Sequence, residues 1–333
     1  MSSIIIVKDS FDDLTKALGF INAADKKICI ITDDNLAELY LKEVSSACSV
    51  LNNSVYSYSI KPGEESKSID TIINIYDFLI QNQFNRDDLI LALGGGVVGD
   101  IAGFAASTYK RGLRFIQVPT TLLAQVDSAI GGKNGCDYDT IKNVIGTFYQ
   151  PSLVYVNKKT TDSLPSDEVS NGRAELIKTG VISGNVFEPG IEECLSFKKM
   201  ITDEDPYDEH KRNILNFGHT LGHAIEAASA YKYKHGVCVG LGMICAFEIS
   251  VKRGWLSTEN LEELKTVLKR NGLLTKIKNI NPDAVLDFCY NDKKIRDGKI
   301  RFILLRGLGN PIITDDVSRK EMIAALETIN EKG

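Results

Sequence analysis

Short apolar segments alternate with helical patterns through the first half of the chain, and this alternation constrains the fold more than any other feature. Lys27–Thr32 and Leu89–Leu93 are compact runs of aliphatic residues, as expected for strands buried on both faces. Ser66–Gln81 carries apolar residues at helical spacing, and Asp100–Thr108 is rich in small residues and also predicts a helix. Three further segments predict strands: Val55–Ile60, Phe115–Pro119 and Ser152–Val156. The alternation predicts a mostly parallel sheet covered by helices on both faces.

The second half of the chain has a different pattern. Helical spacing dominates from about Ser166, and one short strand pair is predicted near Lys299–Leu305 and Pro311–Thr314. The predicted helices are Glu168–Ile182, Lys211–Ala230, Gly236–Arg253 and Glu259–Asn271. We therefore expect a Rossmann-like α/β domain over residues 1–160 and a mainly α-helical domain over residues 161–333.

Composition narrows the class of protein. The 333 residues include 39 Lys+Arg and 44 Asp+Glu, and this mildly acidic balance without a basic run argues against a nucleic-acid or membrane-surface partner. The apolar segment at the N-terminus is too short for a signal peptide, because charged residues follow it at once. No apolar stretch of about 18 residues is evident, so we expect no membrane-spanning helix. The seven cysteines form no CxxC pair, which indicates reduced thiols in the core of a cytoplasmic protein.

A glycine-rich turn follows the predicted strand at Leu89–Leu93. The segment LALGGGVVGD, residues 91–100, leads from a strand through Gly94, Gly95 and Gly96 into a predicted helix. Glycines let the backbone approach a ligand closely, and a helix N-terminus favours a phosphate. The spacing is related to the dinucleotide-binding fingerprint without matching it, so a simple tight turn remains an alternative.

All four histidines of the chain lie within 26 residues, from His210 to His235. His219 and His223 are four residues apart, which places both imidazoles on one face of a helix. Glu175 is a candidate carboxylate partner and would share a helix face with Lys178. Two or three imidazoles with one carboxylate are a common Zn²⁺ ligand set, whereas solvated surface histidines are the alternative.

Cations recur beside small residues between positions 109 and 143. Arg111 precedes Gly112, and Lys133 directly follows Gly131 and Gly132, where backbone and ammonium could meet an anion in a loop. Each cation alone is as easily a solvated surface group.

Two loops complete the set of candidates. Asp33 and Asn35 follow a predicted strand, where a carboxylate can hold a ribose hydroxyl. The segment PGEESK, residues 62–67, predicts a loop that caps the next helix through Glu64 or Ser66.

Taken together, these motifs resemble the 3-dehydroquinate synthase family of sugar-phosphate cyclases. The resemblance runs in order through PGEESK, LALGGGVVGD, VPTTLLAQVDSAIGGK, KNVIGTFYQP, GRAELIK, NFGHTLGHAIE and DKK. The loop near Asn134–Ile141 departs from the family pattern, and Asp205-Pro-Tyr-Asp208 stands in place of its usual acidic run.

The resemblance implies two cofactors, NAD and Zn²⁺ or another divalent ion such as Co²⁺. The implied metal ligands are Glu175, His219 and His235. The implied NAD contacts are Asp33, Asn35, Glu64, Lys67, Gly95, Gly96, Asp100, Thr120, Thr121, Lys133, Lys142 and Ser163.

The resemblance also implies an anionic substrate, 3-deoxy-D-arabino-heptulosonate 7-phosphate. Its phosphate would meet Arg111, Lys133, Asn143 and one lysine of the DKK segment, Lys294 rather than Lys293. Arg212 would hold its carboxylate. The residues implied to contact ring hydroxyls or relay protons are Asp127, Lys133, Lys142, Lys178, Lys198, Asn216 and His223.

The implied reaction yields 3-dehydroquinate and phosphate in the shikimate pathway. NAD oxidises C5 transiently, phosphate leaves by β-elimination, C5 is reduced again, and the ring opens and recloses by an aldol step. A homodimer is also implied. Related cyclases acting on sedoheptulose 7-phosphate or glucose 6-phosphate are the main alternative. A metal-dependent polyol dehydrogenase and a non-enzymatic binding module are more remote.

Overall fold

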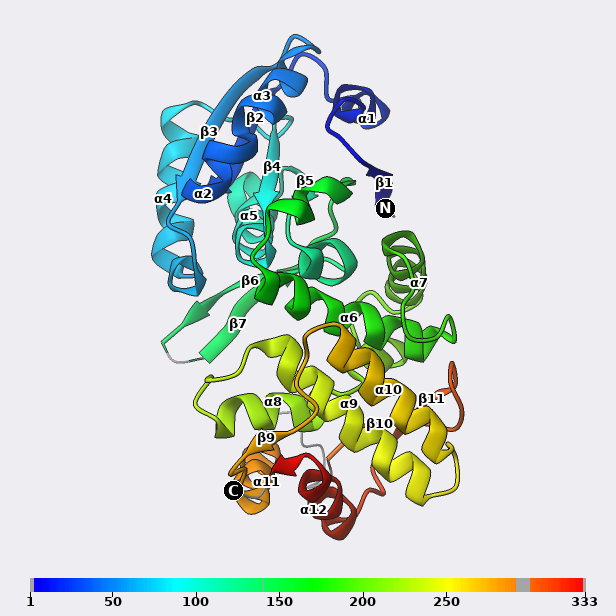
Figure 1. Ribbon diagram of the computed structural model, residues 1–333. Helices are drawn as coiled ribbons and strands as arrows, with labels where there is room; N and C mark the ends of the chain where they lie inside the picture. The colour runs from blue at the N-terminus through cyan, green and yellow to red at the C-terminus, as the bar shows by residue number, and fades with distance from the viewer. Residues whose placement is uncertain (1–2, 140, 292–299, 332–333) are drawn as a thin grey trace. The chain divides into compact units, whose positions relative to one another are not determined.

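The computed structural model describes residues 3–139, 141–291 and 300–331 (Figure 1). The chain divides into two compact units, Met1–Leu164 and Pro165–Gly333. Each unit has its own hydrophobic core.

The first unit is built on a six-stranded sheet in the order β1-β8-β5-β4-β2-β3, and every neighbouring pair is parallel. The strands are β1 (Ile4–Lys8), β2 (Lys27–Asp33), β3 (Ser54–Ile60), β4 (Leu89–Gly94), β5 (Arg114–Pro119) and β8 (Leu153–Asn157). The five predicted strands are confirmed, and β1 adds an edge strand that the sequence pattern did not indicate. The predicted α/β fold class is confirmed as well.

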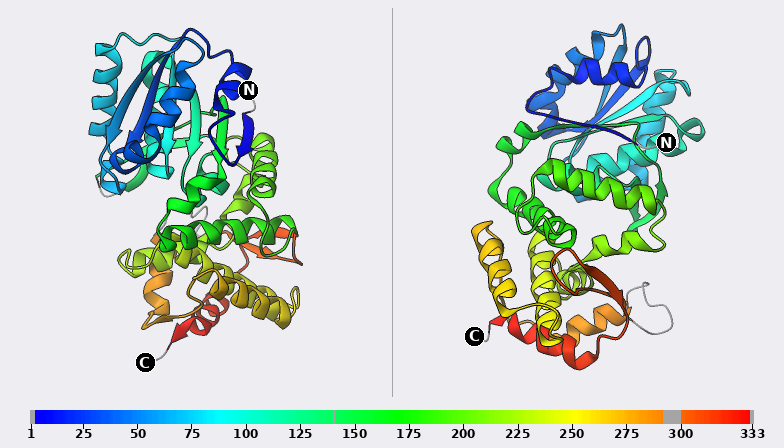
Figure 2. Two further views of the ribbon diagram at one scale, coloured as in Figure 1. Left: turned by 45° about the horizontal axis from the view of Figure 1, so that its top comes forward. Right: turned by 90° about the vertical axis from the view of Figure 1, so that its right-hand side faces the viewer.

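Helices cover both faces of this sheet (Figure 2). Cys29 and Ile31 pack with helices α4 and α5 on one face, whereas Ile28 and Ile30 pack with α1 and α3 on the other. This alternation along β2 explains why the strand is apolar at every position. The helical segments of the unit are α1 (Leu14–Phe20), α2 (Asp34–Leu36), η1 (Ala37–Leu41), α3 (Lys42–Ser49), η2 (Glu64–Ser66), α4 (Ile69–Gln81), α5 (Gly96–Thr108), η3 (Tyr109–Arg111), η4 (Ala124–Ser128) and η5 (Lys158–Ser163).

Two local predictions in the first unit are wrong. Helix α4 begins at Ile69, and Ser68 rather than Glu64 or Ser66 caps it, because the Ser68 side chain accepts a hydrogen bond from the Thr71 amide. Residues 133–148 form an antiparallel hairpin, β6 (Lys133–Tyr138) and β7 (Ile141–Phe148), where we expected a loop at Lys133. Lys133 therefore opens a strand, directly after Gly131 and Gly132, whose φ angles are 100° and 65°.

The second unit is mainly helical, as predicted. Its helices are α6 (Ser166–Ser183), α7 (Ile191–Glu204), η6 (Lys211–Asn216), α8 (His219–Ala228), α9 (His235–Lys252), α10 (Thr258–Arg270), α11 (Pro282–Asn291) and α12 (Arg319–Thr328). Short strands pair as β10 (Phe302–Leu305) with β11 (Pro311–Thr314), as expected, and β9 (Ile277–Lys278) with β12 (Asn330–Glu331). The single helix predicted over 211–230 is wrong, because Gly218 adopts a left-handed conformation (φ 77°) and separates η6 from α8.

Helix α9 is the central helix of the second unit. Contrary to the expectation from the sequence, its 18 residues are long and apolar enough to cross a membrane by length and composition alone, but 72% of the helix is buried inside the protein. Its contacts with the unit's hydrophobic core account for that hydropathy.

Helices α8 and α9 approach closely through glycines. A Cβ atom at position 242 would lie 1.9 Å from the carbonyl oxygen of Gly218 and 2.9 Å from the amide nitrogen of Gly222. These are backbone atoms, which cannot turn away as a side chain could. The close approach fixes the spacing between the two helices that carry His219, His223 and His235.

We predict that Gly242→Ala lowers the free energy of unfolding by about 1–3 kcal/mol, because the added methyl overpacks this contact. Gly240→Ala is the matched control, since its Cβ would meet only the Leu268 side chain at 3.4 Å and a helical alanine is favoured over glycine. Urea unfolding of both variants measures the difference. Equal stability of the two variants would contradict the glycine contact.

Candidate active site

Five of the predicted nucleotide-binding residues lie at the carboxyl ends of neighbouring strands in the first unit. Asp33 ends β2, Gly95 and Gly96 follow β4, and Thr120 and Thr121 follow β5. These three strands are neighbours and parallel, so their carboxyl ends meet at the same edge. Ligands of open α/β sheets bind at that edge.

The glycine turn has the predicted strand–turn–helix geometry. Gly95 is the N-cap of α5, and a Cβ there would lie 3.0 Å from the Thr121 side chain. The Thr120 amide donates to the carbonyl of Gly94 at 3.0 Å. The buried Thr120 hydroxyl has no hydrogen-bond partner within the described part of the chain. Thr120 and Thr121 therefore both lie against the glycine turn at the start of α5.

Asp33 and Ser163 are both held by hydrogen bonds within the first unit. The Asp33 carboxylate caps α2 by accepting from the Leu36 amide at 3.0 Å. Burial raises the pKa of Asp33, and this hydrogen bond opposes the rise. The Ser163 hydroxyl lies 2.7 Å from the Tyr40 hydroxyl.

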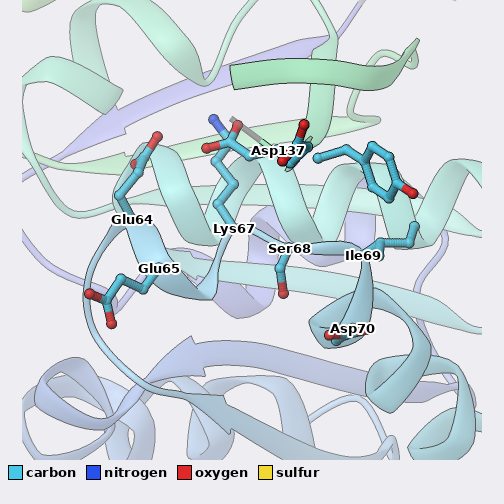
Figure 3. A pocket seen from close by; sticks show the side chains of 9 residues that line it. Glu64, Glu65, Lys67, Ser68, Ile69, Asp70 and Asp137 are labelled. Carbon is cyan, nitrogen blue, oxygen red and sulfur yellow. The ribbon is translucent and has the colours of Figure 1, made fainter. Parts of the chain in front are cut away.

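Glu64 and Lys67 line a pocket of about 490 Å³ in the first unit (Figure 3). Lys67 is buried and forms a 2.6 Å ion pair with Asp100, so two predicted nucleotide contacts are paired with each other. The other lining residues are Glu65, Ser68, Ile69, Asp70, Asp137, Tyr138 and Asp139. Because carboxylates dominate, the pocket suits hydroxyl groups better than phosphates.

Two of the predicted phosphate-binding residues, Arg111 and Asn143, have left-handed backbone conformations. Lys110 and Arg111 have φ angles of 49° and 64°, and Gly112 follows at 117°. Asn143 on β7 has a φ of 52°, and its amide donates to the Asp137 carboxylate at 2.7 Å. Left-handed non-glycine residues cost energy and gather at functional sites. Lys293 and Lys294 lie outside the described residues.

Three residues predicted around these loops have defined positions in the same unit. Asp127 lies in η4, Lys133 opens β6 and Lys142 lies on β7. The hairpin therefore carries both predicted lysines.

In the second unit, the predicted metal ligands converge from three helices. One Glu175 carboxylate oxygen lies 3.4 Å from Nε2 of His219 and 3.3 Å from Nε2 of His235. His223 also joins the group, and the ligand atoms of the three histidines lie within 4.8 Å of one another. The structure thus brings four candidate donors together, including His223, which the histidine spacing made a candidate ligand and the family resemblance made a substrate contact.

Glu175 is 1% exposed and is paired with Lys178 on the same helix. Burial alone would raise its pKa, but Lys178 and the two histidines hold the pKa of this carboxyl well below its usual value. Glu175 is therefore an ionised carboxylate inside the protein. Such a buried anion needs cationic partners, which Lys178 and a bound metal ion would both supply.

Backbone and side-chain acceptors set the orientation of both histidines. His219 Nδ1 lies 3.0 Å from the carbonyl oxygen of Phe217, and His235 Nδ1 lies 3.4 Å from a carboxylate oxygen of Glu226. A carbonyl oxygen and a carboxylate oxygen both accept hydrogen bonds, so this geometry favours a proton on each Nδ1 and leaves Nε2 as the atom that a metal ion would bind. Sequence reasoning missed Glu226, although it ends the NFGHTLGHAIE motif.

The two histidines differ in their tendency to protonate. Burial and Lys178 lower the pKa of His219, so this ring is neutral. Burial also lowers the pKa of His235, but Glu175 and Glu226 outweigh it and raise that pKa to about 9. A metal ion must therefore displace a proton from His235.

The predicted cations of the second unit lie on neighbouring elements. Lys198 is buried on α7, and Arg212 and Asn216 lie on η6. The Arg212 guanidinium donates through Nη1 to the carbonyl of Pro206 at 2.9 Å. Arg212 is only 4% exposed, so the surrounding protein and the hydrogen bond to Pro206 restrict the position of its guanidinium.

Comparisons with known proteins fit this site. The chain is similar to the crystal structure of 2-deoxy-scyllo-inosose synthase complexed with carbaglucose-6-phosphate, NAD⁺ and Co²⁺, with a TM-score of 0.85, 27% identity and coverage of 97% of this chain and 96% of that one. A 2-epi-5-epi-valiolone synthase from Streptomyces hygroscopicus, solved with NAD⁺ and Zn²⁺, shares the fold with a TM-score of 0.86, 24% identity and coverage of 99% and 97%. The fold is thus that of the sugar-phosphate cyclases.

Sequence comparison gives the family. The N-terminal domain of 3-dehydroquinate synthase matches residues 57–171, and its C-terminal domain matches residues 173–295. A 3-dehydroquinate synthase from Ruminiclostridium cellulolyticum is 36% identical over 92% of this chain and 90% of its own length. The chain belongs to the 3-dehydroquinate synthase family.

We predict that Glu226→Gln weakens Zn²⁺ binding by about 10-fold or more, because residues that orient metal-bound histidines contribute 10- to 100-fold in affinity. His235→Ala, which removes a ligand, should leave the purified protein without stoichiometric zinc. Chelator competition measures both. Glu248→Gln is the matched control, since Glu248 is similarly buried but contacts Lys265. Unchanged affinity in Glu226→Gln would contradict the orienting contact.

Proposed function

We propose that this protein is a 3-dehydroquinate synthase that converts 3-deoxy-D-arabino-heptulosonate 7-phosphate to 3-dehydroquinate and phosphate. The observation that carries the proposal is the convergence of Glu175, His219 and His235 in a chain of this family. The curated relatives carry the same name, at 36–39% identity. It is thus a lyase of the shikimate pathway, which leads to chorismate and the aromatic amino acids.

The second unit would hold the metal. Glu175, His219 and His235 form a carboxylate and imidazole donor set that suits Zn²⁺ or Co²⁺. When bound, such an ion polarises substrate hydroxyl groups and eases their ionisation. Lys178 balances the remaining charge of Glu175, and His223, at the edge of the same group, would exchange protons with substrate hydroxyls.

The first unit would hold NAD at the carboxyl edge of its sheet. NAD supplies a transient hydride acceptor, so no net redox change is needed. Gly95 and Gly96 allow the backbone to approach the diphosphate at the start of α5. The carboxylates of Asp33 and Glu64 would accept hydrogen bonds from ribose hydroxyls. The other proposed nucleotide contacts are Asn35, Lys67, Asp100, Thr120, Thr121, Lys133, Lys142 and Ser163.

Positively charged and amide side chains would bind the phosphate and the carboxylate of the substrate. Arg111, Lys133 and Asn143 would hold the phosphate, and Arg212 would hold the carboxylate. Asp127, Lys142, Lys198 and Asn216 would contact ring hydroxyls. Because the protein is acidic overall, binding of an anionic substrate requires positive side chains gathered at the site itself. We thus assign nucleotide binding to residues 1–160 and metal and carboxylate binding to residues 161–333.

We also propose a cytoplasmic homodimer. All seven cysteines are buried thiols rather than members of disulfides, which fits a reducing compartment. The dimer follows only from the family resemblance.

Phosphate release from the heptulosonate with NAD⁺ is the experiment that tests the proposal. We expect chelator-sensitive release without accumulation of NADH, since the cofactor is regenerated. Release from sedoheptulose 7-phosphate or glucose 6-phosphate instead would assign one of the related cyclase activities. Net NADH formation from a polyol would indicate a dehydrogenase.

We predict that Arg212→Ala lowers kcat/KM for the heptulosonate by about 100-fold, because a charge-assisted contact to the carboxylate is lost. Steady-state phosphate release gives this value. Lys211→Ala is the control, since Lys211 is exposed and pairs with Glu204 on the surface. Equal kcat/KM in the wild type and Arg212→Ala would remove Arg212 from carboxylate recognition.

A further inference from the structure

Asp205 is a buried carboxyl group that the proposed chemistry does not use. It lies at the C-terminal end of helix α7 and is 8% exposed. Buried carboxylates are rare without partners, so its contacts indicate what it does.

The Asp205 carboxylate accepts three backbone hydrogen bonds from one turn of chain. Oδ1 accepts from the Glu209 amide at 3.0 Å, and Oδ2 accepts from the amides of His210 at 2.8 Å and Arg212 at 3.0 Å. Burial raises the pKa of Asp205, but these hydrogen bonds outweigh it and the pKa falls below its usual value. An ionised carboxylate thus organises the segment that follows it.

The backbone of this segment is irregular. Asp208 has a left-handed φ of 60°, and His210 has φ and ψ of −138° and −98°, which belong to neither helix nor strand. The turn therefore depends on the side chain of Asp205 to satisfy its amides. The same carboxylate joins α7, which carries Lys198, to η6, which carries Arg212 and Asn216.

The arrangement fixes Arg212 at two points. Its amide donates to Asp205, and its guanidinium donates to the carbonyl of Pro206, the residue directly after Asp205. Movement of the turn would therefore displace both the backbone and the charged head of Arg212.

We propose that Asp205 is a positioning residue that holds Arg212 in place for the carboxylate of the substrate. This inference rests on the proposed function, in which Arg212 binds that carboxylate. Asp205 itself touches no substrate and acts only through the turn.

Asp205→Asn is the most direct test, because it preserves size and removes the charge and one acceptor oxygen. We expect KM for the heptulosonate to rise by about 10- to 100-fold while kcat changes by less than about 3-fold, since a misplaced group costs up to about 100-fold. Bound zinc and the Kd for NAD⁺ should stay at wild-type values. Asp203→Asn is the control, because Asp203 is a more exposed carboxylate on the same helix and pairs with Lys199.

A ligand without a carboxylate separates positioning from general loosening. Sedoheptulose 7-phosphate carries a hydroxymethyl group where the heptulosonate has its carboxylate. Its inhibition constant should be the same, within about 2-fold, for wild type and Asp205→Asn. An equal loss for both ligands would show a merely structural role and overturn the proposal.

A double-mutant cycle tests the route through Arg212. Asp205→Asn should add less than about 2-fold to the loss caused by Arg212→Ala, because the group it positions is already absent. Additive losses would overturn the proposal. Asp205→Glu, which retains the acceptor one methylene away, should give an intermediate KM and serves if the asparagine variant fails to fold.

Phosphate release by the wild-type protein tests the proposed function separately from the role of Asp205. Absence of phosphate release by the wild-type protein would contradict the proposed function and with it the role of Asp205. Wild-type release with an unchanged KM in Asp205→Asn would overturn the role of Asp205 alone.

Discussion

The buried carboxylate of Glu175 is the constraint on which the second unit depends. An ionised group that is 1% exposed requires compensating charge inside the protein. Lys178 supplies it from the same helix, while His219 and His235 reach the opposite oxygen from two other helices. Three helices must therefore meet at one point. The glycine contact between α8 and α9 is what lets two of them approach closely enough.

Buried hydrogen-bond acceptors around the site also hold its residues in position, although these acceptors do not themselves belong to the proposed ligand set. Phe217 and Glu226 fix the protons of His219 and His235, and the carboxylate of Asp205 holds the turn of Arg212. Each of these partners satisfies an amide or imidazole proton that burial would otherwise leave unpaired. The residues that perform chemistry are thus oriented by a second layer of buried acceptors.

Sequence patterns predicted the elements whose periodicity is unbroken. The alternating strands of the first unit and the glycine turn after β4 follow from runs that allow only one assignment. Predictions were wrong where a single backbone angle or the pairing of two strands determines the secondary structure. The helix expected over 211–230 ends at Gly218 because of its left-handed φ, and β6 and β7 form a hairpin because they pair with each other.

The sequence by itself determined the fold class, the family and the identity of the candidate ligands. These follow from local composition and from the order of motifs along the chain. Only the tertiary structure decided that His223 and His235 lie in one group with His219, that Lys67 pairs with Asp100, and that Glu226 and Asp205 support the site. Such contacts join residues through side-chain direction and burial, which depend on how helices pack. No one-dimensional spacing encodes them.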